Sequence, residues 1–334
     1  MTGIDAISAS DAWAIGSPDA APGMLVWHWN GARWLPVPAP DPVPPGPAVP
    51  GGPARCSADA LAVSPDGMVW VFGERGDLED PGGCMLHWNG RDWATGPGWA
   101  EGVAAVAPGP GDLWVFVGDF PIAGPLNAAH FDGTAWSSVK LPVDPGTESV
   151  SALSPGDIWL AGSAPSGTAT RPVVMRWNGR SWSAVPLPAV RLPEGDASIS
   201  LEAVTAVAPD SVWVAGVAAD EAGLADTIVL LHWDGAGWRQ QDSPRRLIPA
   251  GLDGSPDYGG GLNMAPDGSG GLWLTMTPAT GGMTVLARYA GGQWHRVAAP
   301  AGLGTLAAIP GSTSVWGAAS GGIAEYSPYG SSRR

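Results

Sequence analysis

Hydrophobic residues recur along the chain in short runs that end at glycine, proline, asparagine or serine. Seven of these runs have a tryptophan near the start, as in DAWAIG, DIWLAG and SVWVAG. The seven tryptophans are Trp13, Trp70, Trp114, Trp159, Trp213, Trp273 and Trp316. They lie 43 to 60 residues apart, a spacing that is typical of repeat architectures.

A second pattern follows each of the first six runs. Its copies are HWNGARW (28–34), HWNGRDW (87–93), HFDGTAW (130–136), RWNGRSW (176–182), HWDGAGW (232–238) and RYAGGQW (288–294). An aromatic residue and a tryptophan are five positions apart in every copy. Asn-Gly or Asp-Gly between two apolar runs predicts a β-hairpin, because glycine adopts positive φ without steric cost.

A third apolar run precedes each tryptophan run, so each unit predicts four short antiparallel strands. Such a unit cannot bury both faces alone and must stack on its copies. We therefore predict an all-β, seven-bladed β-propeller forming a single domain over residues 1–330, with a tail at 331–334. The expected blades are 1–57, 58–100, 101–147, 148–199, 200–259, 260–302 and 303–330. The seventh unit has no terminal tryptophan, so we expect it to lack most of its outer strand.

Composition and charge narrow the class of protein. The 50 glycines and 35 prolines oppose helices. A formal charge of -15 disfavours nucleic acid and anionic membranes as partners. No apolar stretch approaches the roughly 20 residues of a membrane helix. The start, MTGIDAISAS, lacks a leader pattern, so we expect a soluble monomer, exported only if a leader was removed.

The repeated tryptophans have two interpretations. Large rings at fixed repeat positions are typical of packing between blades. Alternatively, sugars stack on tryptophan faces, and the six hairpins would then offer lectin sites. Trp99 lies off the repeat in a connection, which makes it the candidate ligand contact among the tryptophans.

Four histidines precede the hairpin aromatic, where two other copies have arginine. They are His28, His87, His130 and His232, alongside Arg176 and Arg288. Because arginine replaces histidine there, the position favours a hydrogen-bond donor rather than a metal ligand.

The two ends of the predicted blades differ. One end carries the short, regular turns, and we name it the hairpin face. The other carries the connections that vary in length, and we name it the variable face. These connections include 41–56, 74–84, 190–198, 217–227 and 243–260. Function tends to reside on variable loops set on a rigid frame, so we expect any site on the variable face.

Carboxylates recur near this face. Glu101, Glu148 and Glu202 lie seven residues before an aligned proline in three consecutive blades, and Asp59 lies nearby in blade two. Grouped at the mouth of a central channel, they would suit Ca²⁺ or Mg²⁺ or shared acid and base roles. The loop that contains Arg245, Arg246 and Tyr258 would cover that mouth and contact a ligand.

The two cysteines, Cys56 and Cys84, are both expected on the variable face of blade two. One interpretation is a disulfide that ties down the proline-rich connection, which would imply an oxidising compartment. The other is two unrelated buried thiols.

The combination of DAWAIG, HWNGARW and a PVPAP tail resembles the tryptophan-rich propeller repeats of actinobacterial proteins, and is distantly similar to kelch and sialidase propellers. The resemblance implies the propeller fold over essentially the whole chain and no particular activity. Where the sialidase hairpin box has aspartate, this chain has an aromatic residue.

Two functions follow. The first is a non-catalytic binding or scaffold propeller that recognises a glycan, peptide or protein on its acidic variable face. The alternative is a lyase, cyclase or hydrolase that acts on a small molecule with the carboxylates named above, with or without a divalent metal and with no other cofactor.

Overall fold

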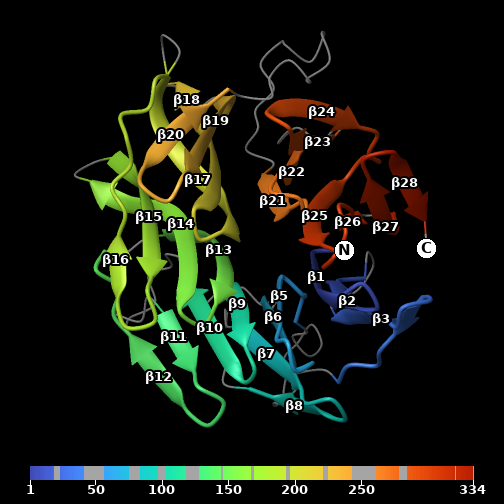
Figure 1. The fold of residues 1–334 in the computed structure, drawn as a ribbon. Helices are drawn as coiled ribbons and strands as arrows, with labels where there is room; N and C mark the ends of the chain where they lie inside the picture. The colour runs from blue at the N-terminus through green and yellow to red at the C-terminus, as the bar shows by residue number, and fades with distance from the viewer. Residues whose placement is uncertain are drawn as a thin grey trace, which may run out of the picture. The chain divides into compact units, whose positions relative to one another are not determined.

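The computed structural model describes residues 1–18, 23–40, 56–74, 83–96, 103–117, 128–143, 146–166, 169–192, 196–220, 225–242, 261–277, 284–319 and 321–333. Within these ranges every helix or strand element is a β-strand. The strands form seven four-stranded sheets, each an antiparallel meander in chain order (Figure 1). The chain is thus the seven-bladed, all-β propeller that the repeat predicts.

Residues Met1–Lys140 form one compact unit with three blades. Blade one contains β1 (Gly3–Ser8), β2 (Asp11–Gly16), β3 (Leu25–Trp29) and β4 (Trp34–Pro36). Blade two contains β5 (Ala60–Val63), β6 (Val69–Glu74), β7 (Gly83–Trp88) and β8 (Trp93–Thr95). Blade three contains β9 (Val103–Gly109), β10 (Asp112–Val117), β11 (Ala128–Phe131) and β12 (Trp136–Val139).

Residues Leu141–Arg333 form a second unit with four blades. Blade four contains β13 (Gly146–Ser154), β14 (Asp157–Ser166), β15 (Ala169–Trp177) and β16 (Trp182–Ala184). Blade five contains β17 (Asp196–Ala208), β18 (Ser211–Asp220), β19 (Ala225–Trp233) and β20 (Trp238–Gln241). Blade six contains β21 (Leu262–Pro266), β22 (Leu272–Met276), β23 (Val285–Ala290) and β24 (Gln293–Val297). Blade seven contains β25 (Leu303–Ala308), β26 (Val315–Ala319), β27 (Gly322–Ser327) and β28 (Gly330–Arg333).

The outer strand of blade seven, β28, has four residues and lacks the tryptophan that the outer strands of the other six blades contain. Three complete strands are followed by β28, which pairs with β27 from Ser327↔Gly330 to Ala324↔Arg333. Residues 331–333, expected as part of a tail, continue this strand. They can do so without a tryptophan, because pairing at a sheet edge depends on backbone groups.

The hairpins fold as the Asn-Gly and Asp-Gly signals predict. In blade one, Trp29 pairs with Trp34 across the turn, and Gly31 adopts a φ of 87°. The side-chain Oδ1 of Asn30 accepts the backbone N–H groups of Ala32 and Arg33, each at 3.1 Å. A short polar side chain thus satisfies the two donors that the turn leaves unpaired.

Aromatic rings fill the spaces between blades within each unit. Trp159 of blade four lies 5.8 Å from Trp233 and 5.9 Å from Trp238 of blade five, centroid to centroid. Trp213 lies 5.0 Å from Tyr289 of blade six. Each ring contributes on the order of 4–6 kcal/mol of gross burial. The repeated tryptophans therefore serve packing between blades, as the first interpretation predicts.

The inner strands are also connected by polar side chains. A side-chain oxygen of one blade accepts a backbone N–H of the next inner strand, a group that has no sheet partner on that side. The pairs are Val63 to Asp5 (3.1 Å), Val204 to Ser149 (3.1 Å), Ala206 to Ser151 (3.0 Å) and Leu306 to Asn263 (2.9 Å).

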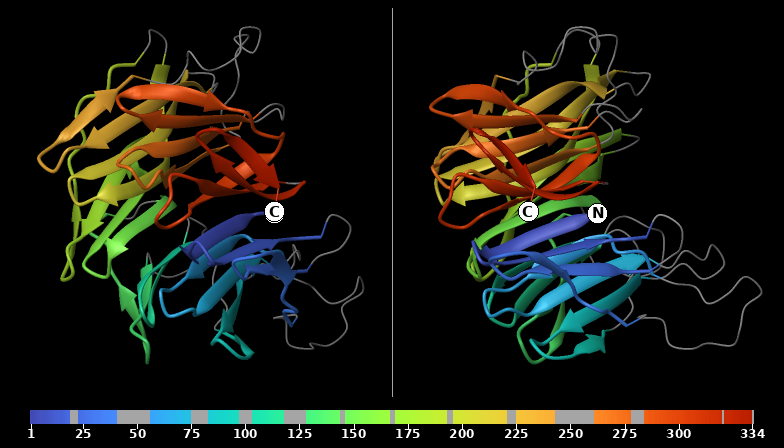
Figure 2. Two further views of the ribbon diagram at one scale, coloured as in Figure 1. Left: turned by 45° about the vertical axis from the view of Figure 1, so that its right-hand side comes forward. Right: turned by 90° about the vertical axis from the view of Figure 1, so that its right-hand side faces the viewer.

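Blades four and five extend further at the variable face than the sequence predicts. The expected loops 190–198 and 217–227 are partly strand, because β17 begins at Asp196, β18 continues to Asp220 and β19 begins at Ala225. These long strands, yellow in Figure 2, continue the apolar and β-branched alternation of Ile199, Leu201 and Ile228. The prediction treated these residues as loops, whereas their backbone continues as paired strands, with Ser198 exposed.

Candidate functional site

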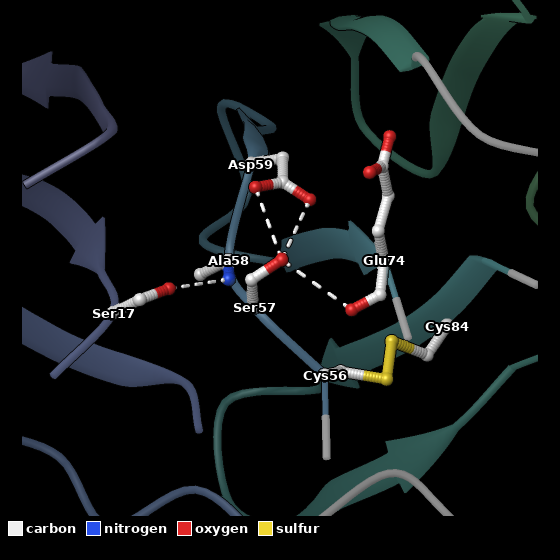
Figure 3. The surroundings of a disulfide bond; sticks show 7 residues. All are labelled: Ser17, Cys56, Ser57, Ala58, Asp59, Glu74 and Cys84. Atoms are coloured by element: carbon white, nitrogen blue, oxygen red, sulfur yellow. Dashed lines mark hydrogen bonds between the residues drawn. A yellow bond between two sulfur atoms is a disulfide. The ribbon is translucent and has the colours of Figure 1, made fainter. Parts of the chain in front are cut away.

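A disulfide lies at the variable face of blade two. It joins Cys56, four residues before β5, to Cys84 on β7, and the two Cα atoms are 6.5 Å apart. Both cysteines are buried. The bond fixes the end of the proline-rich connection to the third strand of the same blade (Figure 3).

Polar groups surround this disulfide (Figure 3). The hydroxyl of Ser57 donates to both carboxylate oxygens of Asp59, at 3.3 and 3.2 Å, and lies 3.3 Å from the carbonyl of Glu74. The backbone N–H of Ala58 donates to Ser17 of blade one at 2.9 Å. The start of β5 is thereby attached both within its blade and to the blade before it.

Asp59 is exposed at this face. Partial loss of hydration raises the pKa of its carboxyl, and the negative charge of Glu74 raises it further, against the opposing effect of the Ser57 hydrogen bond. Glu74 is thus close enough to Asp59 to influence the protonation of that carboxyl at the variable face of blade two.

Glu148 and Glu202 occupy matching positions in blades four and five. The register of β17 against β18 shifts at Glu202, and the register of β13 against β14 shifts at Glu148. Each glutamate thus lies at a β-bulge, a feature that redirects a side chain. The Oε2 atom of Glu202 accepts the backbone N–H of Leu262 in blade six at 2.9 Å. Glu202 therefore connects two blades, whereas a metal or catalytic role for it stays a prediction.

The other predicted site residues cannot be placed in this way. Glu101, Trp99, Tyr258, Arg245 and Arg246 lie outside the described residues, and the side chain of Glu148 does as well. Across the described ranges, no three His, Cys, Asp or Glu side chains gather to hold a metal ion. Among the same residues, no helix is long and apolar enough to cross a bilayer.

The hairpin face carries a repeated polar arrangement. The histidine or arginine before the hairpin aromatic stacks on the tryptophan of the second strand, as His28 does on Trp13 at 4.4 Å and His130 on Trp114 at 4.3 Å. Arg176 lies over Trp159 with its guanidinium carbon 4.8 Å from the ring centroid. A cationic or polar group thus covers each buried ring.

The same side chains bond to a residue at the start of the second strand or in the turn before it. Nε2 of His28 lies 2.9 Å from Asp11, and Nε2 of His130 lies 2.7 Å from Asp112. Arg176 makes a bidentate pair with Asp157 at 2.8 and 2.9 Å. The sequence predicts a hydrogen-bond donor at this position, and these contacts agree with that prediction. The sequence analysis did not predict the acceptor. The aspartate two residues before the tryptophan was the signal that could have identified it.

His87 in blade two is different from its equivalents. Met68 stands where blade one has Asp11, and Nε2 of His87 has no hydrogen-bond partner in the part of the chain that the structure describes. Burial lowers the pKa of this imidazole, against a smaller opposing effect of Asp66. His87 retains the stacking, at 5.1 Å from Trp70.

No protein-family model and no curated protein sequence matches the chain. Solved propeller structures do. A xyloglucanase from Xanthomonas campestris superposes with a TM-score of 0.61 at 17% identity, over 97% of this chain and 51% of the enzyme, so the chain spans about half that enzyme's length. YCF48 from Cyanidioschyzon merolae gives 0.56 at 15% identity, over 98% and 95%. A fucose-specific lectin from Aleuria aurantia gives 0.50 at 13% identity, over 86% and 90%. These similarities establish the propeller fold, and the tryptophan-rich actinobacterial family stays a prediction.

Proposed function

We propose that this chain is a binding propeller that recognises a glycan on its variable face. The observation that carries the proposal is the difference between the two ends of the blades. On the hairpin face, five blades repeat one turn, and six repeat the stacking of a histidine or arginine on the tryptophan of the second strand. The variable face instead carries the long strands of blades four and five and the disulfide-fixed start of β5. A regular frame with differences gathered at one end is typical of a binding scaffold.

The glycan is favoured over a peptide or protein partner by two of the similar propellers. By name, one is a fucose-specific lectin and another is a xyloglucanase, so both concern carbohydrate. Because the interior tryptophans pack between blades, we expect the glycan to contact the connections of the variable face instead.

The test is a glycan array probed with the full purified chain. Ser200 is exposed on β17 near the variable face, and Ser181 is exposed in a hairpin turn, so the same serine-to-arginine change can be made at both ends. Ser200→Arg should weaken binding at least about ten-fold, or about 1.4 kcal/mol. Ser181→Arg should leave it unchanged. A blank array, or loss with Ser181→Arg alone, would overturn the proposal.

The enzyme alternative is favoured by one observation, the matching bulges that carry Glu148 and Glu202. An enzyme with this carboxylate set should lose turnover in Glu148→Gln, with or without added Ca²⁺ or Mg²⁺. If the variant behaves as the parent chain in both binding and turnover, the carboxylates have no catalytic role.

A further inference from the structure

Three exposed hairpin turns contain the dipeptide Asn-Gly, at Asn30, Asn89 and Asn178. In each turn the asparagine Oδ1 accepts two backbone N–H groups, those of the second and third residues after it. The distances are 3.1 and 3.1 Å at Asn30, 3.0 and 2.9 Å at Asn89, and 3.0 and 2.9 Å at Asn178. Two donors therefore converge on one side-chain carbonyl oxygen in blades one, two and four.

Blades three and five carry the same turn with aspartate. Oδ1 of Asp132 accepts N–H groups at 2.9 and 2.8 Å, and Oδ1 of Asp234 accepts them at 3.1 and 3.0 Å. The pKa of Asp132 falls to about 2, chiefly through the Thr134 hydroxyl and then the two backbone donors. The pKa of Asp234 is lowered chiefly by its two backbone donors. The turn thus stabilises negative charge on this oxygen.

Negative charge on Oδ1 is what an asparagine develops when a nucleophile adds to its side-chain carbonyl. The nearest such nucleophile in sequence is the amide nitrogen of the following glycine, which loses its proton as it bonds to Cγ. The two turn donors then stand in the position of an oxyanion hole. Ammonia leaves from Cγ with that proton, a five-membered succinimide results, and water opens it to aspartate or isoaspartate.

We propose that Asn30, Asn89 and Asn178 are sites of intramolecular deamidation, and that the folded hairpin accelerates the reaction. Asn89 reacts first. A Cβ added at Gly90 would meet no atom within 4 Å, whereas one at Gly31 would lie 2.9 Å from Ser10 and one at Gly179 would lie 3.3 Å from Gly156. The turn at Gly90 is thus the most open to water and base.

The two products have different consequences for the fold. Aspartate suits the turn, because Asp132 and Asp234 already hold the same geometry. Isoaspartate adds a backbone carbon between paired strands, which shifts the register of Trp88 against Trp93. Deamidation therefore adds negative charge to the hairpin face, and its isoaspartate branch loosens the outer strand of blade two.

The test is peptide mapping by mass spectrometry after incubation of the full chain at mildly alkaline pH, native and in urea. Each converted amide gains about 1 Da. We expect Asn89 to convert first, and its native rate to exceed its rate in urea by about five-fold, the effect of one hydrogen bond of average strength. Asn263, followed by methionine and held by Leu306, is the internal control and should stay intact.

Slower conversion of all three sites in the native chain than in urea would overturn the proposal, as would conversion of Asn263 at a comparable rate. Asn89→Asp provides the matched variant for the product. It should unfold at the same urea midpoint as the parent chain. A lowered midpoint would refute the equivalence of the five turns.

Discussion

Asp5 on β1 provides the sharpest test of the contacts between inner strands. Its carboxylate accepts the backbone N–H of Ala6 at 2.8 Å and that of Val63 in blade two at 3.1 Å. Burial nevertheless dominates and raises the pKa of Asp5 from 3.8 to about 6. The folded chain therefore holds the proton of Asp5 more tightly than the unfolded chain does between these two pH values.

The sign follows from proton linkage. Below about pH 4 the group is protonated in both states, and its contribution to stability is complete. As pH rises through the folded-state value near 6, the unfolded chain ionises first and that contribution is lost. A shift of about two pKa units corresponds to a loss of up to about 3 kcal/mol at neutral pH.

An asparagine side chain at this position would not titrate, so Asp5→Asn removes this pH dependence. The free energy of unfolding is measured from urea titrations followed by tryptophan fluorescence at pH 4, 5, 6, 7 and 8. The stability of Asp5→Asn relative to the parent chain should rise by up to about 3 kcal/mol from pH 4 to pH 7. Because only the change with pH is compared, any constant cost of the amide cancels. Parallel curves across this range would show that Asp5 is ionised in the folded chain at ordinary pH values, and the reasoning would be wrong.

Three further predictions concern the frame. Cys56→Ser/Cys84→Ser should lower the free energy of unfolding by about 3–4 kcal/mol, as expected for a 28-residue separation, and dithiothreitol should then have no further effect. Trp159→Ala should lower the free energy of unfolding, measured by urea titration, by about 3–5 kcal/mol. The matched exposed variant Arg180→Ala should change it by no more than about 0.5 kcal/mol. Equal effects of the two variants would contradict the packing role of Trp159. Burial acts to raise the pKa of Asp267, but hydrogen bonds from Ser269, Gly271 and Arg288 outweigh it and lower that pKa, so the contribution of Asp267 is present at neutral pH and lost in acid. Asp267→Asn should lower the free energy of unfolding by about 3–5 kcal/mol at pH 7. The difference from the parent chain should become progressively smaller in urea titrations at lower pH.

The blade number and the hairpins were predictable because both depend on local signals that repeat. The number of tryptophan runs gives the number of blades. The dipeptide Asn30-Gly31 specifies a turn, because the glycine adopts positive φ and the asparagine side chain accepts the turn's backbone N–H groups. The packing role of Trp159 followed from its recurrence at one repeat position. Each of these inferences needs only residues within one unit of the repeat.

Features that depend on a neighbouring blade were not predictable in the same way. Glu202 looked like a carboxylate for a ligand or metal, and its hydrogen bond to Leu262 depends on a strand 60 residues later. Asp5 gave no sign of its contact with Val63 for the same reason. The extension of β17 was missed because serine and aspartate suggest a loop, whereas Ser198 and Ser200 are exposed residues of the strand. The hypothesis that the predicted carboxylates form one site also depends on contacts between residues that lie this far apart in sequence.

The hydrogen bonds that Val63, Val204, Ala206, Leu262 and Leu306 donate all run in one direction. The later blade contributes a main-chain donor, and the earlier blade contributes the side chain that receives it. During synthesis, blades two, five, six and seven would therefore meet acceptors that are already folded. Truncation should be asymmetric as well: removing C-terminal blades leaves oxygens that water readily solvates, whereas removing N-terminal blades leaves strand edges with bare amides, the surface on which chains aggregate.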